Sequence, residues 1–298
     1  MAGRAVRDAL GTVDNVEVVE WDMSGPPPLD NIDIVVPPYM GTLDHLTRLE
    51  GLKVGLVQSL SVGFDGVEHV LPANMVFANA SSVHETSTSE MALALILAAQ
   101  RGIPDFVRAA EQGQWAPAWH QSLADRTVLL VGYGGVNQAV ENRLLAFEVT
   151  VIRVARIERD HEHGHVFGLS SLHQQLGRSD IVVVAVPLTA DTVHLVNDAF
   201  LSAMPDGALL VNIARGPVAD TAALLEHARR GRLRLALDVT DPEPLPEGHE
   251  LFGLENVLIS PHVGGATSAA LPRVARLLRE QIERVSRGDE PRNIVLRT

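Results

Sequence analysis

The chain contains no cysteine, so neither a disulfide framework nor thiolate chemistry is available to it. The longest apolar run, from Met91 to Ala99, is too short to span a bilayer. The N-terminus lacks a basic stretch followed by an apolar run, so we expect no signal peptide. A formal net charge of −13 should repel phosphate backbones. We therefore expect a cytoplasmic protein that binds neither membranes nor nucleic acids.

Length and composition are those of a folded protein. The 298 residues suffice for two domains of ordinary size, and 46% of them are apolar while 20% are charged. Such a balance excludes intrinsic disorder as the general state of the chain.

The first part of the chain alternates short β-like runs with helical or loop stretches, which predicts a parallel sheet covered by helices. Met1–Leu10 is predicted to be a helix, as is the strongly apolar stretch Val83–Gln100. The predicted strands are Val16–Trp21, Ile32–Val36, Leu52–Gln58 and Met75–Ala78.

A second alternation begins at Thr127 and predicts a doubly wound parallel sheet. Its predicted helices are Asn137–Ala146 and Ala219–Arg230. A final amphipathic helix, Leu271–Arg287, is expected to return to the first domain. The predicted strands are Thr127–Val131, Val149–Val154, Ile181–Ala185, Ala208–Asn212, Leu235–Val239 and Val257–Ser260.

A glycine-rich turn joins the first strand of this alternation to its helix. Gly132 permits a tight turn, and Gly134 lets the backbone approach a pyrophosphate. The helix that begins near Gly135 and Val136 offers free N–H groups and a positive dipole end. Asn137 replaces the third glycine of the usual fingerprint, so we expect it to push the helix outward or to require a larger neighbouring space. The context predicts a dinucleotide site.

The end of the next strand bears on the choice of cofactor. An acidic residue there would bond a ribose 2′-hydroxyl and repel a 2′-phosphate, but Ala155 occupies the place and Arg156 follows. Since an arginine attracts a 2′-phosphate, NADP(H) is favoured over NAD(H). The alternative is that Arg153 and Arg156 are only solvated surface charges.

Three later strands are each followed by a charged or titratable group, which is where open α/β sheets bind ligands. The segments are Val211-Asn212-Ile213-Ala214-Arg215-Gly216, Asp238-Val239-Thr240-Asp241-Pro242-Glu243 and Pro261-His262-Val263-Gly264-Gly265. With the glycine turn, this order resembles the D-isomer-specific 2-hydroxyacid dehydrogenase family. The resemblance implies hydride transfer between a nicotinamide and the C2 carbon of a small 2-oxo or 2-hydroxy acid, as in a glyoxylate or hydroxypyruvate reductase.

The resemblance assigns catalytic roles that fit the chemistry of the side chains. His262 would deliver a proton to the carbonyl oxygen, since histidine titrates close to neutral pH. Glu243 would bond the other ring nitrogen and orient the imidazole. Arg215 would pair with the substrate carboxylate and polarise the carbonyl, because its planar fork suits a carboxylate better than lysine would.

Further positions are implied by the resemblance alone. Backbone N–H groups of Val62 and Gly63 would receive the substrate carboxylate. Asp238 would bond the nicotinamide carboxamide, although capping of a loop or helix is its alternative role. The remaining cofactor contacts would come from Val186, Pro187, Ile213, Ala214 and Gly264.

Together these features predict an α/β protein with two doubly wound domains, a Rossmann dinucleotide-binding domain inserted in a flavodoxin-like substrate domain. We expect the substrate domain to comprise residues 1–93 and 268–298 and the dinucleotide-binding domain residues 94–267. Family members usually begin with a strand inside the first sheet, whereas this chain begins with a predicted helix.

The resemblance also implies a homodimer, to which Gln100–Leu123 would contribute. Pocket-lining side chains are expected from Tyr39, Met40, Trp115 and Trp119. A cluster of histidines at 161, 163, 165 and 173 suggests a metal site, but no carboxylate or cysteine pattern accompanies it, so we interpret it as a solvated loop without metal. The competing hypothesis for function is a non-catalytic, nucleotide-sensing binding protein on the same scaffold.

Overall fold

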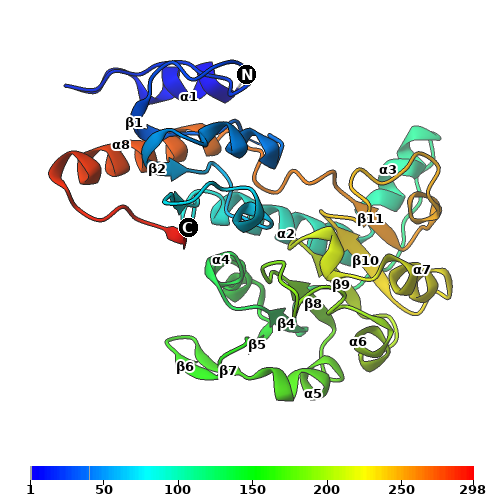
Figure 1. Cartoon of the computed structure of the whole chain (residues 1–298). Coiled ribbons are helices and arrows are strands. Elements are labelled where there is room, and N and C mark those ends of the chain that lie inside the picture. The colour runs from blue at the N-terminus through cyan, green and yellow to red at the C-terminus, as the bar shows by residue number, and fades with distance from the viewer. Residues whose placement is uncertain (1, 40) are drawn as a thin grey trace. The chain divides into compact units, whose positions relative to one another are not determined.

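A computed structural model describes residues 2–39 and 41–298. The chain divides into two compact units (Figure 1). Unit 1 comprises residues 1–84 and 266–298, and unit 2 comprises residues 85–265. The chain thus leaves unit 1 after His84, nine residues before the position expected from the sequence, and returns at Ala266 rather than at 268. The predicted helix from Val83 starts at Glu85 and belongs to unit 2.

Unit 1 is built on a four-stranded sheet in the order β1-β2-β3-β12. The first three strands are parallel, and the C-terminal β12 pairs antiparallel with β3. Helices α1 (Ala2–Leu10) and α8 (Ala270–Arg287) pack together through Val6, Leu10 and the apolar stripe of α8. The strands are β1 (Asn31–Val35), β2 (Lys53–Gln58), β3 (Val76–Ala78) and β12 (Ile294–Arg297).

The prediction of a strand at Val16–Trp21 is wrong. This stretch is not part of a sheet, and Val18 and Val19 are 41% and 44% exposed. Its valines alternate with glutamates at 17 and 20, but apolar residues form a strand only where a partner strand accepts their hydrogen bonds and buries one face. The β12 strand, which the sequence analysis missed, completes the sheet instead.

Unit 2 contains an eight-stranded sheet in the order β11-β10-β9-β8-β4-β5-β7-β6. Only β6 runs antiparallel to its neighbour, and the strand order reverses beside β4, as in a doubly wound dinucleotide fold. The fold class predicted from the sequence is therefore confirmed. The strands are β4 (Thr127–Val131), β5 (Thr150–Val154), β6 (Arg159–His161), β7 (Gly164–Phe167), β8 (Ile181–Val184), β9 (Leu209–Asn212), β10 (Arg234–Leu237) and β11 (Val257–Ile259).

Helices cover both faces of this sheet (Figure 1). Successive residues of β4 alternate between two cores: Val128 and Leu130 face α2 and α4, while Leu129 and Val131 face α5, α6 and α7. Burial on both faces explains why these strands are continuous apolar runs. The helices are α2 (Glu85–Arg101), α3 (Ile103–Glu111), α4 (Gly135–Leu144), α5 (Leu172–Leu176), α6 (Asp198–Ala203) and α7 (Thr221–Arg229).

The histidines at 161, 163 and 165 lie in a hairpin and His173 lies in α5, which corrects the expectation of a loop. Strand β7 joins the sheet beside β5, and β6 pairs with β7. Among the described residues, no group of three potential ligands has the geometry to hold a metal ion. None of the helices in residues 2–39 and 41–298 is long and apolar enough to cross a membrane.

Candidate active site

The three segments that carry Arg215, Glu243 and His262 start from one edge of the unit 2 sheet. Strands β9, β10 and β11 are adjacent and parallel, so their carboxyl ends lie side by side (Figure 1). Each segment begins where one of these strands ends. The sheet topology therefore brings together residues that are far apart in the sequence.

Glu243 and His262 are in direct contact. The Nδ1 atom of His262 lies 2.6 Å from Oε1 of Glu243, with 32% and 40% of the two side chains exposed. This hydrogen bond orients the imidazole and leaves its Nε2 atom as the ring nitrogen that can face a ligand. Both side chains are partly exposed, and the hydrogen bond holds them together.

Asp238, which is 3% exposed, fixes the loop on which His262 lies. Its Oδ1 accepts hydrogen bonds from Ser260 Oγ at 2.6 Å and from Val263 N at 3.1 Å, and its Oδ2 accepts one from Gly264 N at 2.9 Å. Its backbone oxygen accepts the N–H of His262 at 2.7 Å. The structure thus places Asp238 in the loop-capping role that was the alternative to contact with a carboxamide. Spare lone pairs on Oδ2 leave the second role open.

Arg215 is held at the end of β9 by its neighbours. Asn212 Oδ1 accepts the N–H of Ala214, and its Nδ2 donates to the carbonyl of Arg215. A β-carbon at Gly216 would lie only 1.8 Å from the carbonyl oxygen of Thr240, so glycine is needed for this close approach. The approach brings the Arg215 segment against the segment that leads to Glu243. Asn212 was given no role from the sequence, although its position just inside the strand end was a usable signal.

The glycine turn follows β4 as predicted. Gly132 has a φ of 82°, and a β-carbon there would lie 2.6 Å from the carbonyl oxygen of Ala185. Nothing lies within 4 Å of the position that a β-carbon on Gly134 would occupy, so the backbone is open to a phosphate at that point. Gly135 and Val136 form the first turn of α4, where helix N–H groups lack partners within the helix. These residues fit the pyrophosphate of a dinucleotide.

Asn137, in the first turn of α4, forms hydrogen bonds to the glycine turn with its side chain. Its side chain is fully buried, and Nδ2 donates to the carbonyls of Gly132 at 2.6 Å and Val131 at 3.2 Å. Its Oδ1 is buried without a hydrogen-bond partner among the described residues. The amide therefore binds the turn to the helix, and the expected outward displacement of the helix is unnecessary.

A buried polar network lies behind the turn. The Tyr133 hydroxyl donates to Glu141 Oε2, and Arg153 donates to Glu141 through both Nε, at 2.9 Å, and Nη2. Glu141 is fully buried, while 10% of the Arg153 side chain is exposed. Burial, assisted by the Glu141 carboxylate, raises the pKa of Tyr133 to about 12. Arg153 is thus a structural ion-pair partner, and the view of it as a solvated charge is wrong.

The end of β5 presents guanidinium groups rather than a carboxylate. Ala155 is buried, and Arg156 beside it is exposed. Arg159, which the sequence analysis did not single out, donates Nη2 to the carbonyl of Tyr133 within the glycine turn. The nearest carboxylate in the sequence, Glu158, lies 3.3 Å from the backbone N–H of Gly168 and pairs with His165. In the described part of the chain, Arg156 itself makes no ion pair with Glu158.

The other predicted cofactor positions also belong to unit 2. Val186 and Pro187 follow β8, and Val186 Cγ1 would lie 2.8 Å from a β-carbon on Gly132. Ile213 and Ala214 are buried at the end of β9. A β-carbon on Gly264 would lie 2.8 Å from Asp238 Oδ2, so Gly264 allows its N–H to reach that carboxylate.

Val62 and Gly63 lie in unit 1, on the loop after β2. Asn79 Nδ2 donates to the carbonyl of Val62 at 2.7 Å and holds this loop. In the described part of the chain, the N–H groups of Val62 and Gly63 donate to no carbonyl, so they suit an anion. Trp115 and Trp119 are almost completely exposed, at 96% and 103%, in an extended segment of unit 2. Tyr39 stacks on His84 in unit 1, and Met40 lies outside the described residues.

Comparison with protein families and curated proteins gives one consistent result. Residues 93–264 match the family model described as the NAD binding domain of D-isomer specific 2-hydroxyacid dehydrogenases. A glyoxylate reductase from Pyrococcus furiosus is 32% identical over 280 residues, which cover 89% of this chain and 82% of that protein. A glyoxylate reductase from Thermococcus onnurineus is 34% identical over 260 residues, covering 82% of this chain and 77% of that protein.

Solved structures agree. An NADPH-dependent glyoxylate/hydroxypyruvate reductase from Sinorhizobium meliloti, in complex with NADP and sulfate, has a TM-score of 0.84 and 26% identity, and the match covers 98% of this chain and 94% of that one. A D-isomer specific 2-hydroxyacid dehydrogenase from Xanthobacter autotrophicus, in complex with NADPH and MES, has a TM-score of 0.82 and 28% identity over 99% and 95% of the two chains.

The geometry of Asn137 generates a prediction about stability. Asn137→Asp should replace a donor by a carboxylate that faces two carbonyl oxygens, at a cost of about 2 kcal/mol or more. We expect the unfolding temperature of unit 2 to fall by about 5 °C or more in differential scanning calorimetry. Asn142→Asp, on the exposed side of the same helix, is the matched control and should change it little. Equal unfolding temperatures for the two variants would show that the Asn137 bonds are unimportant.

Proposed function

The chain belongs to the D-isomer specific 2-hydroxyacid dehydrogenase family, and we propose that it reduces glyoxylate or hydroxypyruvate with NADPH as the preferred cofactor. Members of the family transfer a hydride between a nicotinamide and the C2 carbon of a small 2-oxo or 2-hydroxy acid. The observation that carries the proposal is the 2.6 Å contact between Glu243 and His262 beside the Arg215 strand end.

The proposed roles follow from what each side chain offers. The nicotinamide, when bound, supplies the hydride. Nε2 of His262 delivers the proton that neutralises the substrate oxygen, while Glu243 holds the ring through Nδ1. Arg215 pairs with the substrate carboxylate through its guanidinium fork. The backbone N–H groups of Val62 and Gly63, on the loop after β2 of unit 1, are suited to bind a carboxylate.

Two features support NADPH over NADH. Ala155 leaves no carboxylate at the end of β5 to repel a 2′-phosphate, and Arg156 is exposed beside it. Arg159 adds a second guanidinium anchored at the glycine turn. The non-catalytic hypothesis has no comparable support, because Asn137 is accommodated in the turn and Glu243 is in contact with His262.

Homodimerisation and a cytoplasmic location remain part of the proposal. The dimer is supported by apolar exposure between positions 100 and 123. Ile103 and Val107 are 47% and 52% exposed on α3, and Trp115 and Trp119 stand in solvent on the segment that follows. A second copy of the chain would bury this surface.

His262→Ala should reduce the turnover of glyoxylate by roughly 10² to 10⁴-fold, because the variant lacks the proposed proton donor. Steady-state kinetics with NADPH and glyoxylate measure this, and fluorescence titration should show unchanged NADPH binding. Turnover near the wild-type rate would rule out the proposed role of His262.

A matched pair of variants tests the partner of His262. Glu243→Gln should lower kcat with little change in NADPH affinity, since the ring loses its charged partner. Glu247→Gln, an exposed neighbour on the same segment, should leave kcat unchanged. If both variants behave alike, the contact with Glu243 has no catalytic role.

Arg156→Ala should weaken NADPH binding by about tenfold or more, because a charge-assisted hydrogen bond is lost, and should leave NADH binding unchanged. Arg178→Ala, an exposed arginine of the same unit, serves as the control for net charge. Wild-type protein that prefers NADH by tenfold would contradict the interpretation of this strand end.

Replacing Trp115 and Trp119 together by serine should convert the dimer into a monomer in sedimentation velocity. Phe252→Ser, another aromatic residue of unit 2 that is 57% exposed, should leave the dimer intact. A wild-type chain that sediments as a monomer at micromolar concentration would disprove the dimer.

A further inference from the structure

A carboxylate lies close to the strand end that is proposed to receive the 2′-phosphate of NADPH, although position 155 itself carries none. The N–H of Ala155 donates to the carbonyl of Phe167 at 2.9 Å. The residue after Phe167 is Gly168, and it donates its N–H to Glu158 Oε2 at 3.3 Å. Glu158 also follows Arg156 by only two residues. A negative charge at this place opposes a 2′-phosphate, as a carboxylate at the strand end does in dinucleotide-binding folds.

The imidazole of His165, on β7, holds this carboxylate. Its Nε2 lies 3.3 Å from Glu158 Oε1, and its Nδ1 lies 2.9 Å from Asp160 Oδ1. The three side chains meet because Asp160 and His165 are cross-strand partners in the β6–β7 hairpin, and Glu158 immediately precedes β6. The ring therefore bridges two carboxylates, and both contacts are ion pairs when it carries its second proton.

The other charged groups around the hairpin have partners of their own. Arg153 on β5 is bound to Glu141, and Arg159 on β6 donates to the carbonyl of Tyr133. The remaining contacts of the hairpin histidines are those of His161 with Tyr133 and of His163 with Glu162. Among the described residues, the carboxylate beside the strand end has its ion pair with His165 and with no arginine.

The charge of His165 changes with pH. The hydrogen bond to Asp160 and the negative charges of Asp160 and Glu158 raise the pKa of His165 above its ordinary value. Below this raised pKa the ring is protonated and compensates the charge of Glu158. As the pH rises through it, the ring becomes neutral and the carboxylate keeps its full charge.

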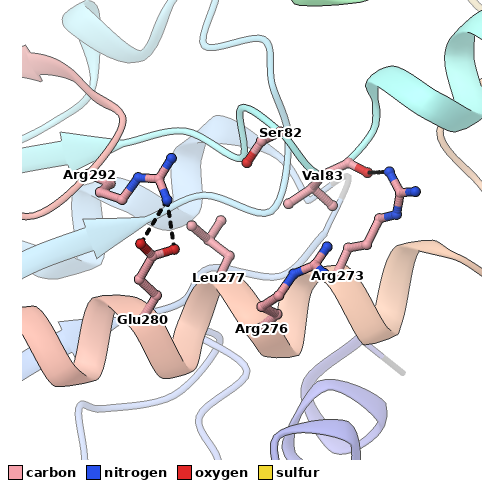
Figure 2. A pocket seen from close by; sticks show the side chains of 7 residues that line it. All are labelled: Ser82, Val83, Arg273, Arg276, Leu277, Glu280 and Arg292. Carbon is pink, nitrogen blue, oxygen red and sulfur yellow. Dashed lines mark hydrogen bonds and ion pairs between the residues drawn. The ribbon is translucent and has the colours of Figure 1, made fainter. Parts of the chain in front are cut away.

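A pair in unit 1 shows the arrangement that does not titrate. Beside a cavity of about 260 Å³, both oxygens of Glu280 accept from Arg292 Nη1, at 2.7 and 2.8 Å (Figure 2). An arginine stays charged throughout the physiological range, so the charge of Glu280 is always compensated. The choice of histidine at position 165 therefore makes the compensation of Glu158 dependent on pH.

We propose that His165 determines the choice of cofactor by neutralising Glu158 beside the position of the 2′-phosphate. When His165 is protonated, Arg156 attracts the 2′-phosphate without opposition from a carboxylate. When the ring is neutral or absent, Glu158 favours a free 2′-hydroxyl and therefore NADH. His165 is a positioning residue, because it acts through Glu158. The inference rests on the proposed function, since it concerns the same cofactor site.

Fluorescence titration of the full-length chain with NADPH and with NADH, at about pH 6 where histidine is protonated, tests the pair. His165→Gln should weaken NADPH binding by about three- to tenfold, because an uncompensated charge then faces a phosphate group through solvent, and should change NADH binding little. The double variant with Glu158→Gln added should bind NADPH as the wild type does, since no carboxylate is left to neutralise. His173→Gln, an exposed histidine of the same unit, is the control and should have no effect.

The pH profile separates an electrostatic role from a structural one. The advantage of the wild type over His165→Gln in NADPH binding should be largest at acid pH and should disappear as the pH rises through the pKa of His165. The 2′-phosphate also titrates, near pH ~6, but it does so in both proteins and cancels in the comparison.

Three outcomes would overturn the role of His165: NADPH binding by His165→Gln equal to that of the wild type, an equal loss of NADPH and NADH binding, or no recovery in the double variant. A wild type that prefers NADH contradicts the proposed function instead. In that case the effect of His165→Gln on NADPH binding, and its reversal by Glu158→Gln, still decides whether this inference holds.

Discussion

The carboxylate of Asp238 determines where His262 lies. It is buried at the end of β10, and it accepts one hydroxyl and two backbone N–H groups from the loop after β11. A buried carboxylate requires several donors, and here a single loop supplies them. That loop is consequently fixed in one conformation, with His262 at a φ of 53° and its ring against Glu243. The pairing of two half-exposed side chains thus depends on a third that is almost completely buried.

The sequence predicted the elements whose physics is local. Apolar runs of four to six residues identified the central strands of unit 2, because strands buried on both faces need continuous apolar side chains. The positions after β9, β10 and β11 could be predicted as one site, because parallel strands end at the same edge. Short edge strands were harder to predict from the sequence. The amino acids of β6 are all polar, and β12 is an apolar run of only three residues followed by Arg297, so pairing with a neighbour is what identifies them as strands.

Side chains whose role depends on a distant partner could not be predicted. Arg153 is polar in a strand and suggests a solvent-facing position, yet Glu141 on α4 draws it into the interior. Asn137 departs from a glycine pattern and suggests strain, yet two carbonyl oxygens lie where its amide can bond them. In both cases the partner is a group that no local pattern specifies. Val18 and Val19 show the converse, since suitable residues without a neighbouring strand stay in solvent.

The segment with Trp115 and Trp119 also determines what the intrinsic fluorescence of the protein reports. The chain has three tryptophans, and Trp21, the other one, belongs to unit 1, where its indole N–H bonds the carbonyl of Gly25. Both indoles of unit 2 therefore lie on one exposed segment, outside the two apolar cores of this unit. In the single chain we expect their emission to have the long wavelength of an indole in water, whether unit 2 is folded or unfolded. The tryptophan emission of unit 2 should therefore report whether another molecule covers this segment. It should change little when the sheet unfolds.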